Sequence, residues 1–224
     1  MANLTKWFGY PIYISQLKNY QEINTEIVPL IKEEVTPTNS QYGRTTDVKP
    51  TELQSIDDNL HLDPRFEKLY KEIDKVIVAA MAVQNYDLDL FEVYITKSWA
   101  TYSTKDQFIA YHRHMSSHYS FVYYPYAEEQ GNLFFLDDEA HKVGLHIPRR
   151  EPYFNKWDSS NYAKAEYPAT TGNIIIFPSM IFHETGINTK EDARISISGD
   201  IMLTMKANIK SEHNIPSPST WRMV

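Results

Sequence analysis

The chain has 224 residues, of which 42% are hydrophobic and 13% aromatic, so it can bury a substantial core as one domain or as one domain with an extension. Its net charge of −7 argues against nucleic acid or an anionic membrane as partner, because both attract clustered lysine and arginine. The absence of cysteine excludes disulfides, thiolate metal sites and a cysteine nucleophile, and no apolar run reaches the length of a membrane span. The first residues lack the pattern of a signal peptide, so we expect a cytoplasmic protein.

Residues 1–87 are expected to form a helical support region. Within it, residues 15–34 carry apolar side chains at near-helical spacing, although Pro29 would disturb the interior of a helix. Residues 36–59 contain the sequence TPTNS, a glycine and a later proline, and this composition predicts a loop.

The helix prediction is clearer for residues 63–84. Asp63 can cap the helix, Pro64 suits the first helical position, and the apolar residues that follow recur on one face. The members of this stripe are Phe66, Leu69, Tyr70, Ile73, Ile77, Ala80 and Met81. The stripe predicts a packing face.

Residues 88–206 change to alternating patterns and short apolar runs, separated by turn signals. The segments are FEVYITKSWATYS, SFVYYPY, GNLFFLDD, GNIIIFP and ARISISGDIMLTMK. Many short strands without intervening helices predict a mainly β fold, an antiparallel sandwich or small barrel with the N-terminal helices packed outside it. We expect this core, the support region and a tail at residues 207–224 to form a single domain.

A long irregular stretch at residues 138–171 interrupts the predicted strands. A loop of this length inside a compact domain is usually functional or disordered. It carries Trp157 and the basic pair Arg149 and Arg150. We expect it to be a lid over the substrate.

Three of the eight histidines fall within the segment YHRHMSSHYS. His112 and His114 are two residues apart, so on an extended strand their side chains leave the same face, as two ligands of one ion require. His183 follows a later apolar run, and Arg194 and Ser196 lie beyond it on one predicted strand. Imidazoles suit Fe(II), and an arginine with a nearby hydroxyl can grip a carboxylate. The set can therefore hold a first-row metal and a small dicarboxylate.

Each of these features also has a plainer explanation. A close pair of histidines is often solvated or hydrogen-bonded, and we expect this of His118. Arg194 could form a surface ion pair with Asp192 or Asp200. The order and spacing of the whole set nevertheless favour the metal and dicarboxylate site.

From His112 onward the chain resembles the 2-oxoglutarate/Fe(II)-dependent oxygenases. The segments that carry the likeness are WFGYPIYISQL, YHRHMSSHYSFVYYPY, GNLFFLDD and GNIIIFPSMIFHETGINTKEDARISIS, which look like a bacterial and phage subgroup with the motif HxHPxSxLSGxYY. Met115, Tyr119 and Phe121 depart from that motif, at the positions of its proline, leucine and glycine.

The resemblance implies a double-stranded β-helix, or jelly roll, in which His112 and His183 bind Fe(II). Most of the superfamily has an acid where this chain has His114. Three arrangements remain open: His114 completes an all-histidine set, water takes the position, or Asp137 reaches in from a neighbouring strand. We favour the first.

The resemblance also implies that Arg194 and Ser196 hold the far carboxylate of 2-oxoglutarate. Tyr102, ten residues before His112, matches a tyrosine that bonds this carboxylate in similar prolyl hydroxylases. Tyr124, on the strand after the histidine pair, could line the same pocket.

The activity implied is that of a dioxygenase that uses O2 and converts 2-oxoglutarate to succinate and CO2 while it hydroxylates a prolyl or other peptide side chain, or a small metabolite. One alternative is a cupin-like iron dioxygenase without 2-oxoglutarate, which would have no use for Arg194. Another is a non-enzymatic jelly-roll binding or virion-associated protein with a degenerate metal site. A phage-encoded chain would work in the host cytosol. A homodimer is a further expectation, because the segment YPIYI could pair across a dimer edge.

Overall fold

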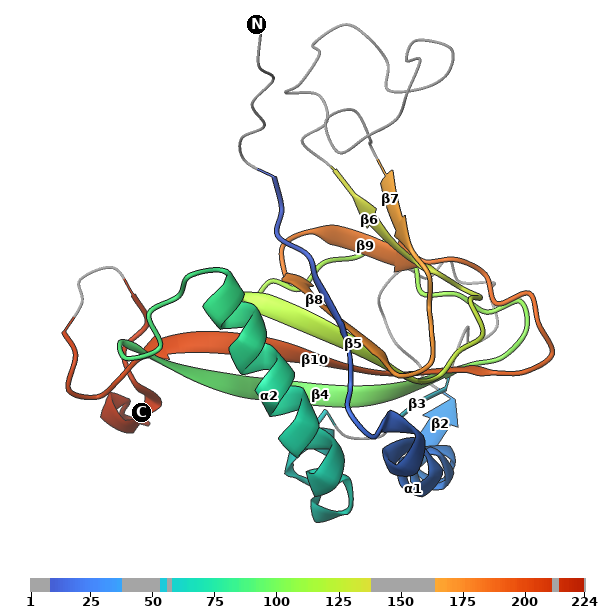
Figure 1. Cartoon of the computed structure of the whole chain (residues 1–224), viewed down its shortest axis with the longest axis horizontal. Helices are drawn as coiled ribbons and strands as arrows, with labels where there is room; N and C mark the ends of the chain where they lie inside the picture. The colour runs from blue at the N-terminus through green and yellow to red at the C-terminus, as the bar shows by residue number, and fades with distance from the viewer. Residues whose placement is uncertain (1–8, 38–52, 56–57, 138–163, 211–213, 224) are drawn as a thin grey trace, which may run out of the picture.

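The computed structural model describes residues 9–37, 53–55, 58–137, 164–210 and 214–223. In this part of the chain a large antiparallel sheet lies against a small one, and two α-helices cover the other face of the large sheet (Figure 1). The fold is mainly β with flanking helices, and its two sheets form the double-stranded β-helix that the sequence predicted.

Seven strands form the large sheet, in the order β1-β8-β5-β10-β4-β3-β2, and neighbouring strands are antiparallel. They are β1 (Tyr13–Gln16), β2 (Val35–Pro37), β3 (Leu53–Ser55), β4 (Phe91–Ser103), β5 (Tyr119–Tyr126), β8 (Asn173–Pro178) and β10 (Arg194–Met205). Strands β4, β5, β8 and β10 lie where alternation and short apolar runs predicted them. Strand β1 comes from the YPIYI segment, pairs with β8 of the same chain and lies at one edge of the sheet.

Three short strands form the small sheet, in the order β7-β6-β9. They are β6 (Leu133–Leu136), β7 (Lys164–Tyr167) and β9 (Phe182–Thr185). Two differences from the expected loops appear. Residues 164–167 of the expected lid form β7, and both ends of the expected loop at residues 36–59 contribute to the strand pair of β2 and β3.

Helix α2 (Glu67–Val83) begins as predicted, after a capped 3-10 turn. A carboxylate oxygen of Asp63 accepts a hydrogen bond from the backbone amide of Arg65 at 2.9 Å, and Pro64 opens the turn. The predicted stripe is buried along its whole length. This burial fixes the helix on the large sheet.

Helix α1 (Tyr20–Glu34) contains Pro29, which the sequence predicted would disturb it. The proline is exposed, whereas Ile23, Ile27 and Ile31 are buried on the opposite side. The carbonyl group that loses its hydrogen bond to a proline therefore lies on the solvent side of the helix, where water can satisfy it.

The two faces of the large sheet contact different layers. On β10, Ile195, Ile197 and Ile201 belong to the core shared with the helices. On the opposite face, Val122 of β5 and Phe177 of β8 pack toward the small sheet. Side chains alternate along each strand, so every strand in the centre of the sheet contributes to both layers.

None of the described helices is both long enough and apolar enough to cross a membrane.

Candidate metal centre

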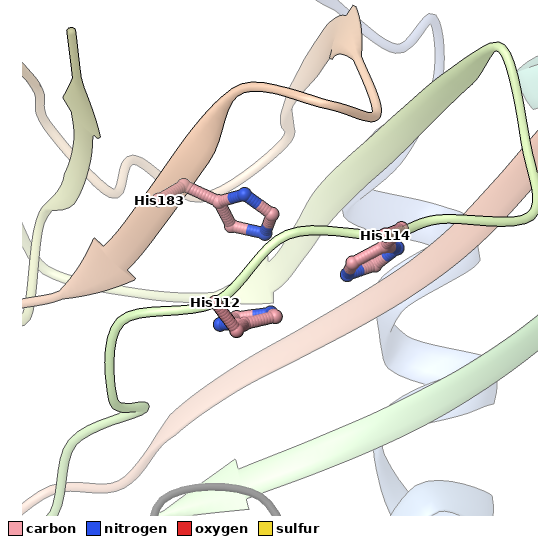
Figure 2. A group of neighbouring side chains, drawn as sticks. All are labelled: His112, His114 and His183. Carbon is pink, nitrogen blue, oxygen red and sulfur yellow. The ribbon is translucent and has the colours of Figure 1, made fainter. Parts of the chain in front are cut away.

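Three histidines from distant parts of the chain converge between the sheets. His112, His114 and His183 each offer a ring nitrogen, and these three atoms lie within 4.8 Å of one another. Figure 2 shows the rings turned toward a common centre, with His183 on β9 and the other two on the segment before β5. Their ring centroids are 4.2 to 5.3 Å apart. Such a group can bind one metal ion.

Backbone pairing holds this geometry. The amide of His112 donates to the carbonyl of His183 at 3.0 Å, and the amide of His183 donates back at 2.8 Å. The amide of His114 donates to the carbonyl of Ser179 at 2.9 Å. The histidine pair was expected on an extended strand, but it lies on a connecting segment with only this isolated bridge. The prediction of the strand was therefore wrong at these residues, although both side chains do point the same way.

Hydrogen bonds at Nδ1 fix the orientation of all three rings. The Nδ1 atom of His112 lies 2.7 Å from the carbonyl oxygen of Ala110, and that of His183 lies 2.9 Å from the carbonyl oxygen of Ile181. A carbonyl oxygen can only accept, so Nδ1 carries the proton in both rings and Nε2 keeps the lone pair that a metal needs. The Nδ1 atom of His114 lies 2.5 Å from a carboxylate oxygen of Asp200, which selects the same tautomer.

Burial keeps the inner histidines neutral. Burial lowers the pKa of His183 to about 3, helped by the neighbouring His112. The ring of His183 packs edge to face on Phe177 at 4.8 Å, which accounts for part of this burial. Burial also lowers the pKa of His112. Neutral imidazole is the form that binds metals, so both side chains are ready to bind one near pH 7.

Asp200 is the functional residue that the sequence reasoning missed. It is 2% exposed and accepts hydrogen bonds from His114 at 2.5 Å and from the hydroxyl of Ser120 at 2.7 Å. Burial alone would raise the pKa of its carboxyl group, but the bonds from His114 and Ser120 and the charge of Lys97 outweigh this effect and hold the pKa below its usual value. Alternation along β10 was the available signal, because Asp200 shares a face with Arg194.

The alternative third ligand, Asp137, does not belong to the converging group. It follows β6, whose last residue, Leu136, pairs with Phe182. Among the described residues, only the three histidines meet the spacing that one ion requires.

Arg194 lies at the start of β10 and is 1% exposed. Its guanidinium donates to the carbonyl of Gly131 and, at 3.1 Å, to the hydroxyl of Ser103. Gly131 has a φ of +58°, and a Cβ atom there would lie 2.5 Å from Nη1 of Arg194. Only glycine suits both the left-handed backbone and this close approach. The alternative of a surface ion pair is wrong, because Arg194 is buried.

Unsatisfied hydroxyl groups lie near this arginine. Tyr124 is buried, and its hydroxyl has no hydrogen-bond partner among the described residues. Burial raises its pKa to about 12, while the nearby charge of Arg194 opposes the shift. Ser196 is 3% exposed and pairs across the strands with Thr101, whose buried hydroxyl also has no partner in the described part of the chain. Buried polar atoms without partners are rare and often await a ligand.

Tyr102 does not join this group, so its predicted role at the same carboxylate was wrong. Tyr102 pairs with Ile195, and residues paired across antiparallel strands share a face. Its ring therefore packs with the helix-side core, on the face opposite to Arg194. The neighbouring residues of β4, Thr101 and Ser103, occupy the site face instead.

Aromatic side chains surround the histidines on the outer side. Tyr111 and Phe182 stack at 4.3 Å, and the guanidinium carbon of Arg113 lies 4.5 Å from the Phe182 ring. The ring of Trp99 is 5.6 Å from that of His114. The predicted lid residues Trp157, Arg149 and Arg150 lie outside the described residues.

His118 is part of the same sequence motif but not of the cluster. Its Nδ1 accepts a hydrogen bond from the backbone amide of Leu203 at 3.1 Å. The expectation that it is solvated was wrong, because it fastens the segment before β5 to β10.

Comparisons with known proteins agree with this site. Residues 97–200 match the family model described as "Putative 2OG-Fe(II) oxygenase", and this stretch contains the three histidines, Arg194 and Asp200. No curated protein sequence matches the chain.

Several solved structures are similar in fold. A prolyl-4-hydroxylase from Pseudomonas putida has a TM-score of 0.54 at 12% identity, covering 87% of this chain and 92% of that one. HygX from Streptomyces hygroscopicus, with nickel, 2-oxoglutarate and hygromycin B bound, has a TM-score of 0.55 at 14% identity, covering 87% and 83%. A prolyl hydroxylase from Trichoplax adhaerens, in complex with a hypoxia inducible factor peptide fragment, has a TM-score of 0.55 at 12% identity, covering 85% and 83%. By the sequence of residues 97–200 and by its fold, the chain belongs to the 2-oxoglutarate/Fe(II)-dependent oxygenase superfamily.

Proposed function

We propose that the protein binds Fe(II) through Nε2 of His112, His114 and His183, and that it hydroxylates a substrate with 2-oxoglutarate and O2 as co-substrates. The observation that carries the proposal is the convergence of three ring nitrogens within 4.8 Å of one another. Three protein ligands on one side of an iron ion leave its remaining coordination positions open for a chelating acid and for dioxygen.

The choice of His114 over water or Asp137 as third ligand follows from its orientation. Its ring is fixed through Nδ1 by Asp200 at 2.5 Å, as the rings of the other two ligands are fixed through Nδ1 by backbone carbonyls. A histidine ligand usually makes such a bond with its second nitrogen. A solvated or merely structural histidine does not require it.

The far carboxylate of 2-oxoglutarate is assigned to Arg194, with Ser196, Tyr124 and Thr101 around it. All four residues are buried. The hydroxyls of Tyr124 and Thr101 have no partner within the described chain, and a carboxylate oxygen is an acceptor that either could bond. An arginine can donate two parallel bonds to such a group.

When bound, iron and 2-oxoglutarate supply the oxidative chemistry, with succinate, CO2 and a hydroxylated substrate as products. The protein's own residues hold and orient these groups. The histidines present lone pairs from rings fixed at Nδ1, and Arg194 sets the direction of the dicarboxylate. Phe177, packed on His183, excludes water from the inner side.

The substrate class is either a peptide side chain or a small molecule. Prolyl hydroxylases and HygX with its bound hygromycin B share the fold, so the fold is compatible with both. The rim of Tyr111, Phe182 and Trp99 offers flat apolar surfaces on which a ring of either class could stack.

The test is conversion of 2-oxoglutarate to succinate by anaerobically purified protein, reconstituted with Fe(II) and then given oxygen. Succinate formation that needs iron, and that is absent in His183→Ala, is expected. Iron binding with oxygen consumption but no loss of 2-oxoglutarate would instead support a cupin-like dioxygenase. A protein that binds no Fe(II), Mn(II) or Ni(II) would support a non-enzymatic jelly roll.

A further inference from the structure

The third histidine is held differently from the other two. His112 and His183 donate to backbone carbonyls, which carry only partial charges, whereas His114 donates to the carboxylate of Asp200. We propose that Asp200 is a positioning residue of the metal centre. It fixes the His114 imidazole as a ligand and supplies through it the negative charge that a carboxylate ligand would otherwise bring. This inference rests on the proposed function, because it assumes that the three histidines bind a metal.

The carboxylate of Asp200 is itself rigidly held. It lies on the central strand β10 and is 2% exposed. One oxygen accepts from His114 at 2.5 Å and from Ser120 at 2.7 Å, and the other lies 3.4 Å from the Nζ atom of Lys97. A ring bonded to such a group cannot rotate without breaking a charge-assisted hydrogen bond.

The same group of side chains also fixes the backbone of the ligand segment. The hydroxyl of Ser120 lies 2.8 Å from that of Ser179, which accepts from Ser117 at 2.8 Å. The carbonyl of Ser179 accepts from the amide of His114 at 2.9 Å. Asp200 and its hydroxyl partners therefore fix both the main chain and the ring of His114.

Charge explains why a buried acid is placed here. Three neutral imidazoles around a divalent ion leave the site one unit more positive than two imidazoles and a carboxylate. Removing a carboxylate from water is costly unless it is paired, and at Asp200 the pairs are a ligand histidine and Lys97. Partners of this kind raise the basicity of the ligand nitrogen and strengthen metal binding.

The competing account is a protonated His114 that forms an ion pair with Asp200 and binds no metal. In that account Nε2 carries a proton, and its position within 4.8 Å of the other two ligand nitrogens has no role. The two accounts predict opposite results when the charge of Asp200 is removed, since only a ligand histidine transmits the change to a metal.

The experiment titrates Co(II) into the anaerobic, metal-free protein and records affinity by calorimetry and the visible ligand-field bands by absorption. Asp200→Asn keeps the shape and one acceptor oxygen but removes the charge. We expect Co(II) binding to weaken by about 10- to 100-fold, with a shift of the visible bands. Asp192→Asn removes the same charge from an exposed side chain just before β10 and should leave both unchanged.

The outcomes separate this inference from the function on which it rests. Co(II) binding by the wild type that is equalled by Asp200→Asn, in affinity and in spectrum, overturns the role of Asp200 and leaves the metal site standing. Absence of Co(II) binding by the wild type overturns both. If Asp200→Asn does not fold, NMR of the Zn(II)-loaded wild type with 15N-labelled histidine replaces it. A proton on Nδ1 of His114 and metal on Nε2 support the inference, and a metal-free ring or metal on Nδ1 overturns it.

Discussion

The two faces of strand β10 do different work. One face carries Ile195, Ile197 and Ile201, which pack with the helices, and the other carries Arg194, Ser196 and Asp200, which lie toward the small sheet. All six are buried, yet one set is apolar and the other is charged or polar. A strand buried on both faces normally carries apolar residues on both, because unpaired polar groups destabilise the fold. The polar face is therefore explained by ligands rather than by folding.

The comparison predicts that substitutions on the two faces separate. Those on the helix face should lower the free energy of unfolding and leave the affinity for metal and 2-oxoglutarate unchanged. Those on the site face should do the reverse, as far as buried partners allow.

The largest effect is expected from His183→Ala. It removes one of three proposed ligands, so calorimetric titration should detect no binding of Mn(II) or Co(II). His118→Gln is the matched control, because His118 belongs to the same motif but bonds the backbone of Leu203 instead of facing the cluster. Equal metal affinity in His183→Ala and the wild type would rule out the histidine site.

On the helix face, Ile197→Ala should lower the free energy of unfolding by about 2 to 5 kcal/mol, the usual range for truncating a buried isoleucine. The measurement is urea unfolding followed by circular dichroism. Val78→Ala, on an exposed part of α2 where the side chain is 48% exposed, is the control and should change little. A loss of metal affinity in the folded Ile197→Ala protein would show that the two faces are not independent.

On the site face, Arg194→Met keeps most of the side-chain volume and removes the charge. Loss of a hydrogen bond to a charged group costs about 1.5 to 3 kcal/mol, so the dissociation constant of 2-oxoglutarate should rise roughly 10- to 150-fold. Titration of 2-oxoglutarate into the Mn(II)-loaded protein measures this, and unchanged Mn(II) affinity is the internal control. An unchanged dissociation constant would remove Arg194 from the co-substrate site.

The smallest effects distinguish two tyrosines on opposite faces. Tyr124→Phe should raise the dissociation constant of 2-oxoglutarate roughly 2- to 10-fold, which corresponds to one neutral hydrogen bond of about 0.5 to 1.5 kcal/mol. Tyr102→Phe should leave it unchanged, because the ring of Tyr102 packs on the helix side. The reverse result in the same titration would mean that the register of β4 against β10 is misassigned.

Much of this arrangement could be read from the sequence. The alternation in β4 and β10 and the apolar runs of β5 and β8 predicted the core strands, and the spacing of His112, His183 and Arg194 predicted the site. These signals are local, or depend on a few residues in a fixed order, so one chain suffices to show them.

The errors arose where the answer depends on register. Tyr102 was chosen by its offset from His112, but irregular residues separate the two, and only the pairing of Tyr102 with Ile195 decides its face. Asp200 was missed because its contact with His114 joins two segments 86 residues apart. Strands as short as β7 and β9, with four residues each, are also too brief for an alternation to stand out.

A crystal structure of the protein loaded anaerobically with Mn(II) and 2-oxoglutarate tests the central claim most directly. The account predicts a single ion bonded to Nε2 of His112, His114 and His183, with the far carboxylate of the co-substrate at Arg194. An ion bound elsewhere, or a co-substrate that does not contact Arg194, would contradict it.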